Sequence, residues 1–230
     1  MLSCKKEKVP VSDVLFGLKL SRHTILADGS SKVTITVKLN AAAETGKRGV
    51  IFNASSGNFS GGTNSSITVT ASFVNDSLIA KATYVAPLNS NKIYFTVMPD
   101  IPDKEKYTLY DSITVEKSQA FSIKLNPSSF GLKSNFASED TIKGILLNSS
   151  GNGVSLGTSV IFEDLLINQQ PANGQFRSVV DKSDVNSSVS AIYSVGPLPL
   201  GTNIWLKSTV LDSIGGKTSI NNSVKITITQ

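Results

Sequence analysis

Short segments in which apolar and polar residues alternate constrain this chain more than any other feature of its sequence. Between residues 32 and 39, Val33, Ile35, Val37 and Leu39 alternate with lysine and threonine. A period of two is typical of a half-buried β-strand, and no window shows an apolar stripe at helical spacing. Short strands separated by turns rich in glycine, serine and asparagine predict an all-β sandwich or barrel. Further alternating segments occupy residues 49–53, 66–73, 78–85, 92–98 and 112–116.

The second half of the sequence repeats the first. Five segments recur in the same order, at offsets of about 105 to 113 residues. A duplicated unit of this size is usual for an immunoglobulin-like (Ig-like) sandwich, so we expect two tandem Ig-like β-sandwich domains. Domain 1 is predicted at residues 13–117 and domain 2 at residues 118–230, after an N-terminal tether at residues 1–12. The paired segments are 16–20 with 121–125, 49–52 with 159–162, 80–84 with 189–193, 91–95 with 203–206, and 112–115 with 225–228.

The first repeat contains motifs that resemble the bacterial Ig-like repeats of invasins and intimins. In these repeats an Ala-Asp-Gly turn, here Ala27-Asp28-Gly29, precedes a strand of alternating threonine and valine. The resemblance covers about residues 15–98 and also includes Gly49-Val50-Ile51-Phe52 and Ala80-Lys81-Ala82. The second repeat has Leu132-Lys133-Ser134 in place of the turn. The resemblance implies a sandwich of seven or eight strands that serves as a stalk or adhesive module on bacterial surfaces. It implies no catalysis and no shared binding residues.

The N-terminus holds the only cysteine, Cys4, which follows Leu2 and Ser3 and precedes a run of charged residues. This arrangement resembles the end of a bacterial lipoprotein signal peptide, which implies cleavage before Cys4 and attachment of lipid to it. Residues 1–3 would then be the remainder of a signal peptide whose basic start and apolar run precede this numbering. Two or three acyl chains give stable anchoring to a membrane. The alternative is a lone cysteine in a polar tail.

The net charge of +5 is spread along the sequence rather than gathered in one segment. A nucleic-acid-binding protein concentrates basic residues on one face beside aromatic residues, so we expect no nucleic-acid partner. The lysines beside Cys4 favour anionic lipid headgroups or, equally, a soluble tail. A single cysteine excludes an internal disulfide, so the stability of the fold must come from packed cores.

Catalytic and metal sites find little support in the residue types present. His23 is the only histidine, so neither a Ser-His-Asp unit nor a zinc site of several histidines and cysteines can be assembled. The close acidic residues in segments 100–105 and 181–184 do not match a calcium-binding loop. We therefore expect no enzyme activity, no metal and no cofactor.

Two sets of side chains are candidates for contact with a partner. Leu165, Leu166 and Ile167 precede a turn and form a candidate partner surface, with ordinary strand burial as the alternative. Tyr107 and Tyr110 lie in a predicted loop and are the candidates for binding a glycan. Other large aromatic residues are expected in the cores, because such side chains dominate sandwich interiors. They are Phe52, Phe162, Tyr84, Tyr193 and Trp205.

An aspartate followed by a hydroxyl residue and an aliphatic residue occurs four times, where about one match is expected by chance. The pattern looks like the O-glycosylation signal of some lipoprotein-rich Gram-negative bacteria. It implies O-glycosylation at Ser77, Ser112, Thr141 and Ser213. The alternative is that Asp-Ser and Asp-Thr begin strands, since these residues favour turns.

These patterns lead us to expect a non-enzymatic, lipid-anchored structural or interaction protein of the bacterial outer membrane. It would be adhesin-like or an accessory subunit of a larger membrane complex. Its partners would be the membrane, through lipid on Cys4, and a protein in or on the outer membrane. The cell surface is favoured over the periplasmic face. The alternative is a glycan- or ligand-binding surface lipoprotein.

Overall fold

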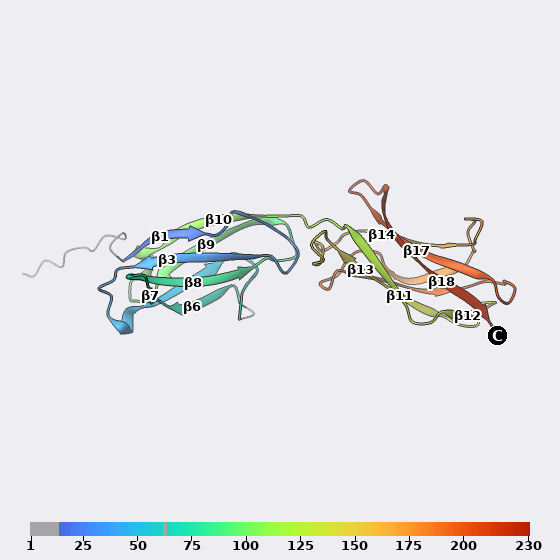
Figure 1. Ribbon diagram of the computed structural model, residues 1–230, viewed down its shortest axis with the longest axis horizontal. Helices are drawn as coiled ribbons and strands as arrows, with labels where there is room; N and C mark the ends of the chain where they lie inside the picture. Colours follow the sequence, from blue (N-terminus) through green and yellow to red (C-terminus); the bar gives the residue numbers. More distant parts are fainter. Residues whose placement is uncertain (1–13, 62–63) are drawn as a thin grey trace, which may run out of the picture. The chain divides into compact units, whose positions relative to one another are not determined.

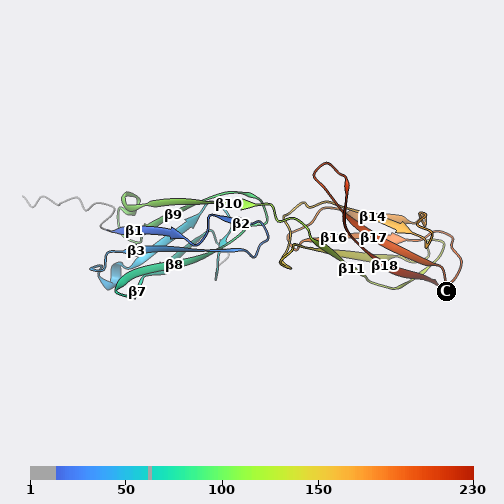
Figure 2. The ribbon, with the colours of Figure 1, turned by 45° about the horizontal axis from the view of Figure 1, so that its top comes forward.

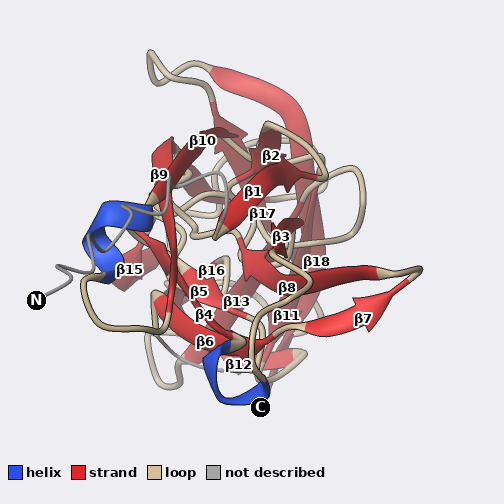
Figure 3. Ribbon diagram, turned by 90° about the vertical axis from the view of Figure 1, so that its left-hand side faces the viewer, coloured by secondary structure: helices blue, strands red, loops and turns tan. Residues whose placement is uncertain are grey.

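The computed structural model describes residues 14–61 and 64–230, so Cys4 and the whole of the predicted tether lie outside the described residues. The described residues form two compact units that divide between Glu116 and Lys117. Each unit is a β-sandwich of two sheets, which confirms the all-β prediction of two sandwiches. The helical segments in Figure 3 are short 3-10 turns, η2 (Thr45–Lys47) and η3 (Lys104–Tyr107). In the described ranges, no helix is long and apolar enough to cross a membrane.

Unit 1 contains two five-stranded sheets. One has the order β1-β3-β8-β5, with β7 also paired to β8, and the other has the order β2-β10-β9-β4-β6. Strands β1, β3 and β8 lie side by side in Figures 1 and 2. All pairs are antiparallel except β2, which runs parallel to β10. The strands are β1 (Leu15–Leu20), β2 (Thr24–Leu26), β3 (Lys32–Leu39), β4 (Gly49–Ala54), β5 (Asn58–Phe59), β6 (Ser66–Thr70), β7 (Ser72–Val74), β8 (Ser77–Val85), β9 (Asn91–Pro99) and β10 (Leu109–Glu116).

Unit 2 contains two four-stranded sheets, ordered β11-β13-β16-β15 and β12-β18-β17-β14. Its short strand β12 runs parallel to β18, as β2 does to β10 in unit 1. The shared strand order and the shared parallel pair are the structural counterpart of the sequence repeat. The strands are β11 (Ser122–Pro127), β12 (Gly131–Lys133), β13 (Asp140–Leu147), β14 (Val160–Leu165), β15 (Gln175–Val180), β16 (Ser188–Ser194), β17 (Asn203–Leu211) and β18 (Lys217–Thr229).

Alternation along β3 determines which of its side chains reach the core of unit 1. Val33, Ile35 and Val37 are fully buried, and the lysines and threonines between them face outward, as predicted. Burial of each large apolar side chain stabilises the fold by about 1.5–3 kcal/mol. A continuous series of rings crosses this core, with centroid separations of 6.5, 5.9 and 5.0 Å between Phe52, Phe59, Tyr84 and Phe95 in turn.

The segment 66–73, predicted as a single strand, is divided between the two sheets of unit 1. Its first part, β6, pairs with β4, and its last part belongs to β7, which pairs with β8. The chain changes sheets at Ala71, which is buried and donates its N–H to the carbonyl of Arg48 at 2.8 Å. Alternation was intact on both sides of this crossing, so the pattern gave no sign of it.

The predicted core positions are confirmed for Phe52, Tyr84 and Tyr193, but Trp205 was assigned wrongly. Its neighbours Ile204 and Leu206 are buried, so alternation along β17 turns Trp205 to the outer face of the sheet. Phe162 is half-buried and packs beside Phe176, at a centroid separation of 6.1 Å. The register of a residue on its strand, and not the size of its side chain, decides whether that side chain reaches the core.

Candidate functional site

Trp205 is the centre of an apolar surface on unit 2. Strand β17 pairs with β14 so that Trp205 lies directly opposite Leu165, which places both side chains on the outer face of the sheet. Ile167, two residues beyond Leu165, is 81% exposed. We call Leu165, Ile167 and Trp205 the Trp205 patch. Two of the three residues predicted as a partner surface therefore lie beside a tryptophan that the sequence did not link to them.

Leu166, the third predicted residue, has a different role. Its side chain is half-buried and packs against the core of unit 2. Its N–H donates to the carbonyl of Gln170 at 2.8 Å, and the N–H of Gln169 donates to the carbonyl of Leu166 at 2.9 Å. Leu166 thus fixes the loop after β14 while its neighbours Leu165 and Ile167 are presented outward.

A buried tyrosine and a carboxylate close the base of the same loop. Asp164 Oδ2 accepts the hydroxyl of Tyr193 at 2.9 Å and the N–H of Gly174 at 2.7 Å. Burial, the negative charge of Asp164 and the hydrogen bond to it raise the pKa of Tyr193. The base of the loop that carries Ile167 is therefore held by hydrogen bonds to the protein interior.

A shallow hollow of about 310 Å³ adjoins the Trp205 patch. This volume is at the lower end of the range for small-molecule sites, and the hollow is open to solvent. A partly exposed apolar surface beside such a hollow is better suited to a protein segment than to an enclosed ligand. It is lined by Leu166, Ile167, Asn168, Thr202, Asn203 and Trp205.

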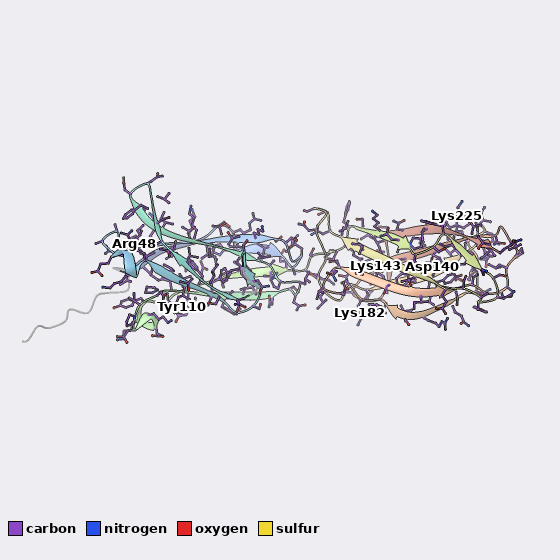
Figure 4. The ribbon with its side chains drawn as sticks, turned by 90° about the horizontal axis from the view of Figure 1, so that it is seen from below. Arg48, Tyr110, Asp140, Lys143, Lys182 and Lys225 are labelled. Atoms are coloured by element: carbon purple, nitrogen blue, oxygen red, sulfur yellow. The ribbon has the colours of Figure 1, made fainter. Side chains whose placement is uncertain are left out.

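Tyr94 occupies the position in unit 1 that Trp205 occupies in unit 2. Both follow a fully buried isoleucine, on β9 and β17 respectively, and both face outward. Tyr94 lies opposite Ser112 on β10, and Tyr110 lies opposite Thr96, so the two tyrosines are diagonal neighbours about 7–8 Å apart. Tyr94 is 58% exposed and Tyr110, labelled in Figure 4, is 74% exposed. We call this pair the tyrosine face.

The two loop tyrosines predicted from the sequence separate in the structure. Tyr110 is a strand residue, whereas Tyr107 ends the 3-10 turn η3 and is only half-exposed. Lys92 adds a cation to the tyrosine face, with its Nζ 5.5 Å from the centroid of the Tyr94 ring. Tyr94 is not among the residues predicted from the sequence, although its outward direction between the buried Ile93 and Phe95 follows from alternation.

The four predicted glycosylation positions lie in different settings. Ser213 is exposed in the β17–β18 turn, and Ser77 begins β8 after a turn in which Asn75 and Asp76 have positive φ. Ser112 is half-buried within β10, and Thr141 is exposed on β13. No common geometry unites the four.

His23 Nδ1 lies 3.9 Å from Asp111, on the surface. Within residues 14–61 and 64–230, no group of three or more histidine, cysteine or acidic side chains is placed to hold a metal ion.

Comparison with known proteins supports the fold. No family model and no curated protein sequence matches this chain. Among solved structures, invasin, described as a bacterial integrin-binding protein, matches with a TM-score of 0.62 and 15% identity over 94% of this chain and 39% of that chain. The Yersinia pseudotuberculosis adhesin InvE matches with a TM-score of 0.46 and 15% identity, over 95% of this chain and 61% of that chain. A β-glycosidase from Bacteroides vulgatus matches more distantly, with a TM-score of 0.35 and 10% identity over 91% of this chain and 24% of that chain.

The chain spans less than two thirds of the invasin and InvE structures. At 15% identity, the similarity to invasin shows a common fold and leaves the binding residues to be identified from this chain alone. The protein is built from two Ig-like β-sandwiches of the kind found in invasin.

Proposed function

We propose that this protein is a non-enzymatic, lipid-anchored interaction protein of the bacterial outer membrane, displayed at the cell surface. In this role it binds a protein partner, as an adhesin-like module or as an accessory subunit of a larger membrane complex. The observation that carries the proposal is the Trp205 patch, an outward-facing, half-buried tryptophan flanked by Leu165 and by Ile167, which is 81% exposed. Tryptophan is enriched among the residues that dominate binding energy at protein interfaces.

Substitution of the patch tests the binding part of the proposal. The full chain is used to capture partners from detergent-solubilised membranes of its own host, and each captured protein is then titrated with purified variants. Trp205→Ala is expected to weaken binding at least about 30-fold, the usual loss at a dominant interface residue. Ile167→Ser is also expected to weaken binding. Ile214→Ser is the matched control, because Ile214 is 92% exposed on another turn of unit 2. Equal binding by all three variants would remove the patch from the proposal.

Lipid anchoring is tested separately at Cys4. Native protein is expected to show an intact mass that begins at an acylated Cys4, and Cys4→Ser is expected to leave the membrane fraction. The reason is that two or three acyl chains anchor a protein stably. Recovery of an unmodified chain that retains residues 1–3 contradicts anchoring while leaving the binding result intact.

Glycan binding is the second candidate function, and the tyrosine face favours it. Two exposed rings on one face of a sheet lie among hydroxyl side chains, including Ser112 and Thr96, which face the same way. Aromatic rings offer an apolar surface with a polar edge, which suits the faces of sugar rings. On an array of glycans, Tyr94→Ala and Tyr110→Ala should abolish any signal that Phe130→Ala, an equally exposed aromatic substitution in unit 2, retains. Signal that survives both tyrosine substitutions would exclude this face.

A further inference from the structure

The outer face of the β1-β3-β8 sheet carries four lysines and no acidic residue. Lys32 and Lys38 come from β3, Lys19 from β1 and Lys81 from β8, and all four side chains are exposed. None of these three strands contains aspartate or glutamate. Within the described part of the chain, no carboxylate forms an ion pair with any of the four. We call these lysines the lysine face.

Strand register brings three of the four lysines together. Thr36 lies opposite Lys19 on one side and opposite Lys81 on the other, so these two lysines are two strand spacings, about 10 Å, apart. Lys38 lies two residues along β3 from Thr36, about 7 Å away on the same face. Lys32 is four residues from Thr36 in the other direction. The cations are therefore spread over a surface instead of lying along a line.

A β-bulge is responsible for the position of Lys19. Phe16 pairs with Lys38 and Lys19 pairs with Thr36, so three steps on β1 match two steps on β3. Gly17, between them, has a φ of 62°, which glycine adopts without strain. Without the additional residue, Lys19 would face the opposite side from Phe16 and point into the sandwich. The bulge thus places Lys19 on the same face as the exposed ring of Phe16.

Apolar side chains accompany the cations. Phe16 is 40% exposed and lies opposite Lys38, and Ile79 lies opposite Lys38 on its other side. Lysine ammonium groups with interspersed aromatic and aliphatic side chains are typical of surfaces that lie in the headgroup region of a bilayer. The lysines supply attraction to anionic headgroups, and the ring supplies contact with the apolar boundary beneath them.

We propose that the lysine face docks unit 1 on an anionic lipid surface. Charge complementarity selects the occupant, since four unpaired cations over three adjacent strands match a surface of phosphate-bearing headgroups. A linear polyanion is instead held in a groove that follows its backbone. Phe16 provides an apolar contact that a soluble polyanion does not need. This contact is independent of lipid on Cys4 and is therefore testable in its absence.

The test uses the full chain with Cys4→Ser, so that no acyl chain contributes to binding. Partition is measured into vesicles of phosphatidylcholine with and without phosphatidylglycerol. The variant Lys19→Gln, Lys38→Gln, Lys81→Gln is expected to lose about a hundredfold in partition into the anionic vesicles, at about fivefold for each lysine. The control Lys124→Gln, Lys133→Gln, Lys182→Gln changes net charge equally in unit 2 and should retain binding. Thermal unfolding confirms that both triple variants are folded.

Three outcomes overturn the proposal. The first is equal partition of the two triple variants, which would mean that net charge and not this face governs binding. The second is equal binding to neutral and anionic vesicles. The third is heparin binding that depends on the three lysines when vesicle binding does not, which would make the face a site for soluble polyanions. Loss of binding in about 1 M salt, where the Debye length falls to about 3 Å, is expected if the proposal holds.

Discussion

The hydroxyl of Tyr193 lies 2.9 Å from Oδ2 of Asp164, 29 residues earlier in the chain. The equivalent tyrosine of unit 1, Tyr84, donates instead to the backbone carbonyl of Ser56, also at 2.9 Å. In both tyrosines the ring is fully buried, and the hydroxyl group donates a hydrogen bond at the edge of the core. Unit 2 has therefore replaced a neutral acceptor with a carboxylate, which also holds the N–H of Gly174.

We expect Tyr193→Phe to destabilise its unit more than Tyr84→Phe destabilises unit 1. Hydrogen bonds to charged groups contribute about 1.5–3 kcal/mol, against about 0.5–1.5 kcal/mol for neutral pairs. Tyr193→Phe should also speed hydrogen exchange at Gly174, whose N–H shares the carboxylate. Denaturant unfolding and hydrogen-exchange mass spectrometry measure the two effects. Equal losses of stability in the two variants would show that the carboxylate adds nothing to the bond.

The same two tyrosines predict a loss of stability in alkali. Burial raises the pKa of Tyr84, and burial together with Asp164 raises the pKa of Tyr193. A group whose pKa is higher in the folded state stabilises the fold below its unfolded pKa, about 10 for tyrosine, and this contribution is lost as the pH rises further. The free energy of unfolding should therefore fall between about pH 10 and pH 12, and less steeply in the Tyr84→Phe, Tyr193→Phe double variant. A parallel decline in both proteins would assign the alkaline transition to other groups.

Adjacent residues of β17 should differ sharply in their contribution to stability. Ile204→Ala leaves a cavity in the core of unit 2 and should cost about 2–5 kcal/mol. Trp205→Ala removes a larger side chain from the outer face, where the cost is expected to be about 1 kcal/mol. Denaturant titration of the two variants gives the comparison. A loss for Trp205→Ala as large as that for Ile204→Ala would mean that the tryptophan is packed as a core residue and is unavailable to a partner.

Alternation was sufficient to predict the class of fold and most of the strands, because each sheet has one face on a core. Alternation also predicts that Trp205 and Tyr94 face outward, since each lies between two buried residues of its strand. Alternation does not predict the division of residues 66–73 between two sheets, because Ala71 continues the apolar pattern while the backbone changes its pairing partner from β4 to β8.

The surfaces proposed for binding depend on contacts between strands that are distant in sequence. Leu165 and Trp205 meet through the pairing of β14 with β17, and no local pattern links them. Lysines that seemed dispersed along the chain gather on β1, β3 and β8 once these strands pair. Lys19 joins them only through the bulge at Gly17, which simple alternation does not anticipate.

The last prediction concerns the Asp–hydroxyl–aliphatic pattern, whose four aspartates differ in their burial and hydrogen bonds. Asp140 is buried and accepts the N–H groups of Ser128 and Ser129, at 2.8 and 3.0 Å. The carboxylate of Asp111 accepts the N–H of Ser112 at 2.7 Å. Asp212 likewise accepts the N–H groups of Ile214 and Gly216, at 3.0 and 2.7 Å, so the turn explanation of the pattern applies at Thr141, Ser112 and Ser213.

The aspartates of the Ser77 and Ser213 motifs are exposed, whereas Asp140 is buried and Asp111 is half-buried. Ser77 is half-buried but follows the exposed Asp76, and Ser213 lies on an exposed turn next to Ile214. An enzyme that acts on the folded protein can reach these two motifs, so we expect glycopeptides at Ser77 and Ser213 at higher occupancy than at Ser112 and Thr141. Mass spectrometry of peptides from protein expressed in its own host measures all four. Equal occupancy would indicate modification before folding, whereas four unmodified peptides would leave only the preference of aspartate for turns to explain the repetition.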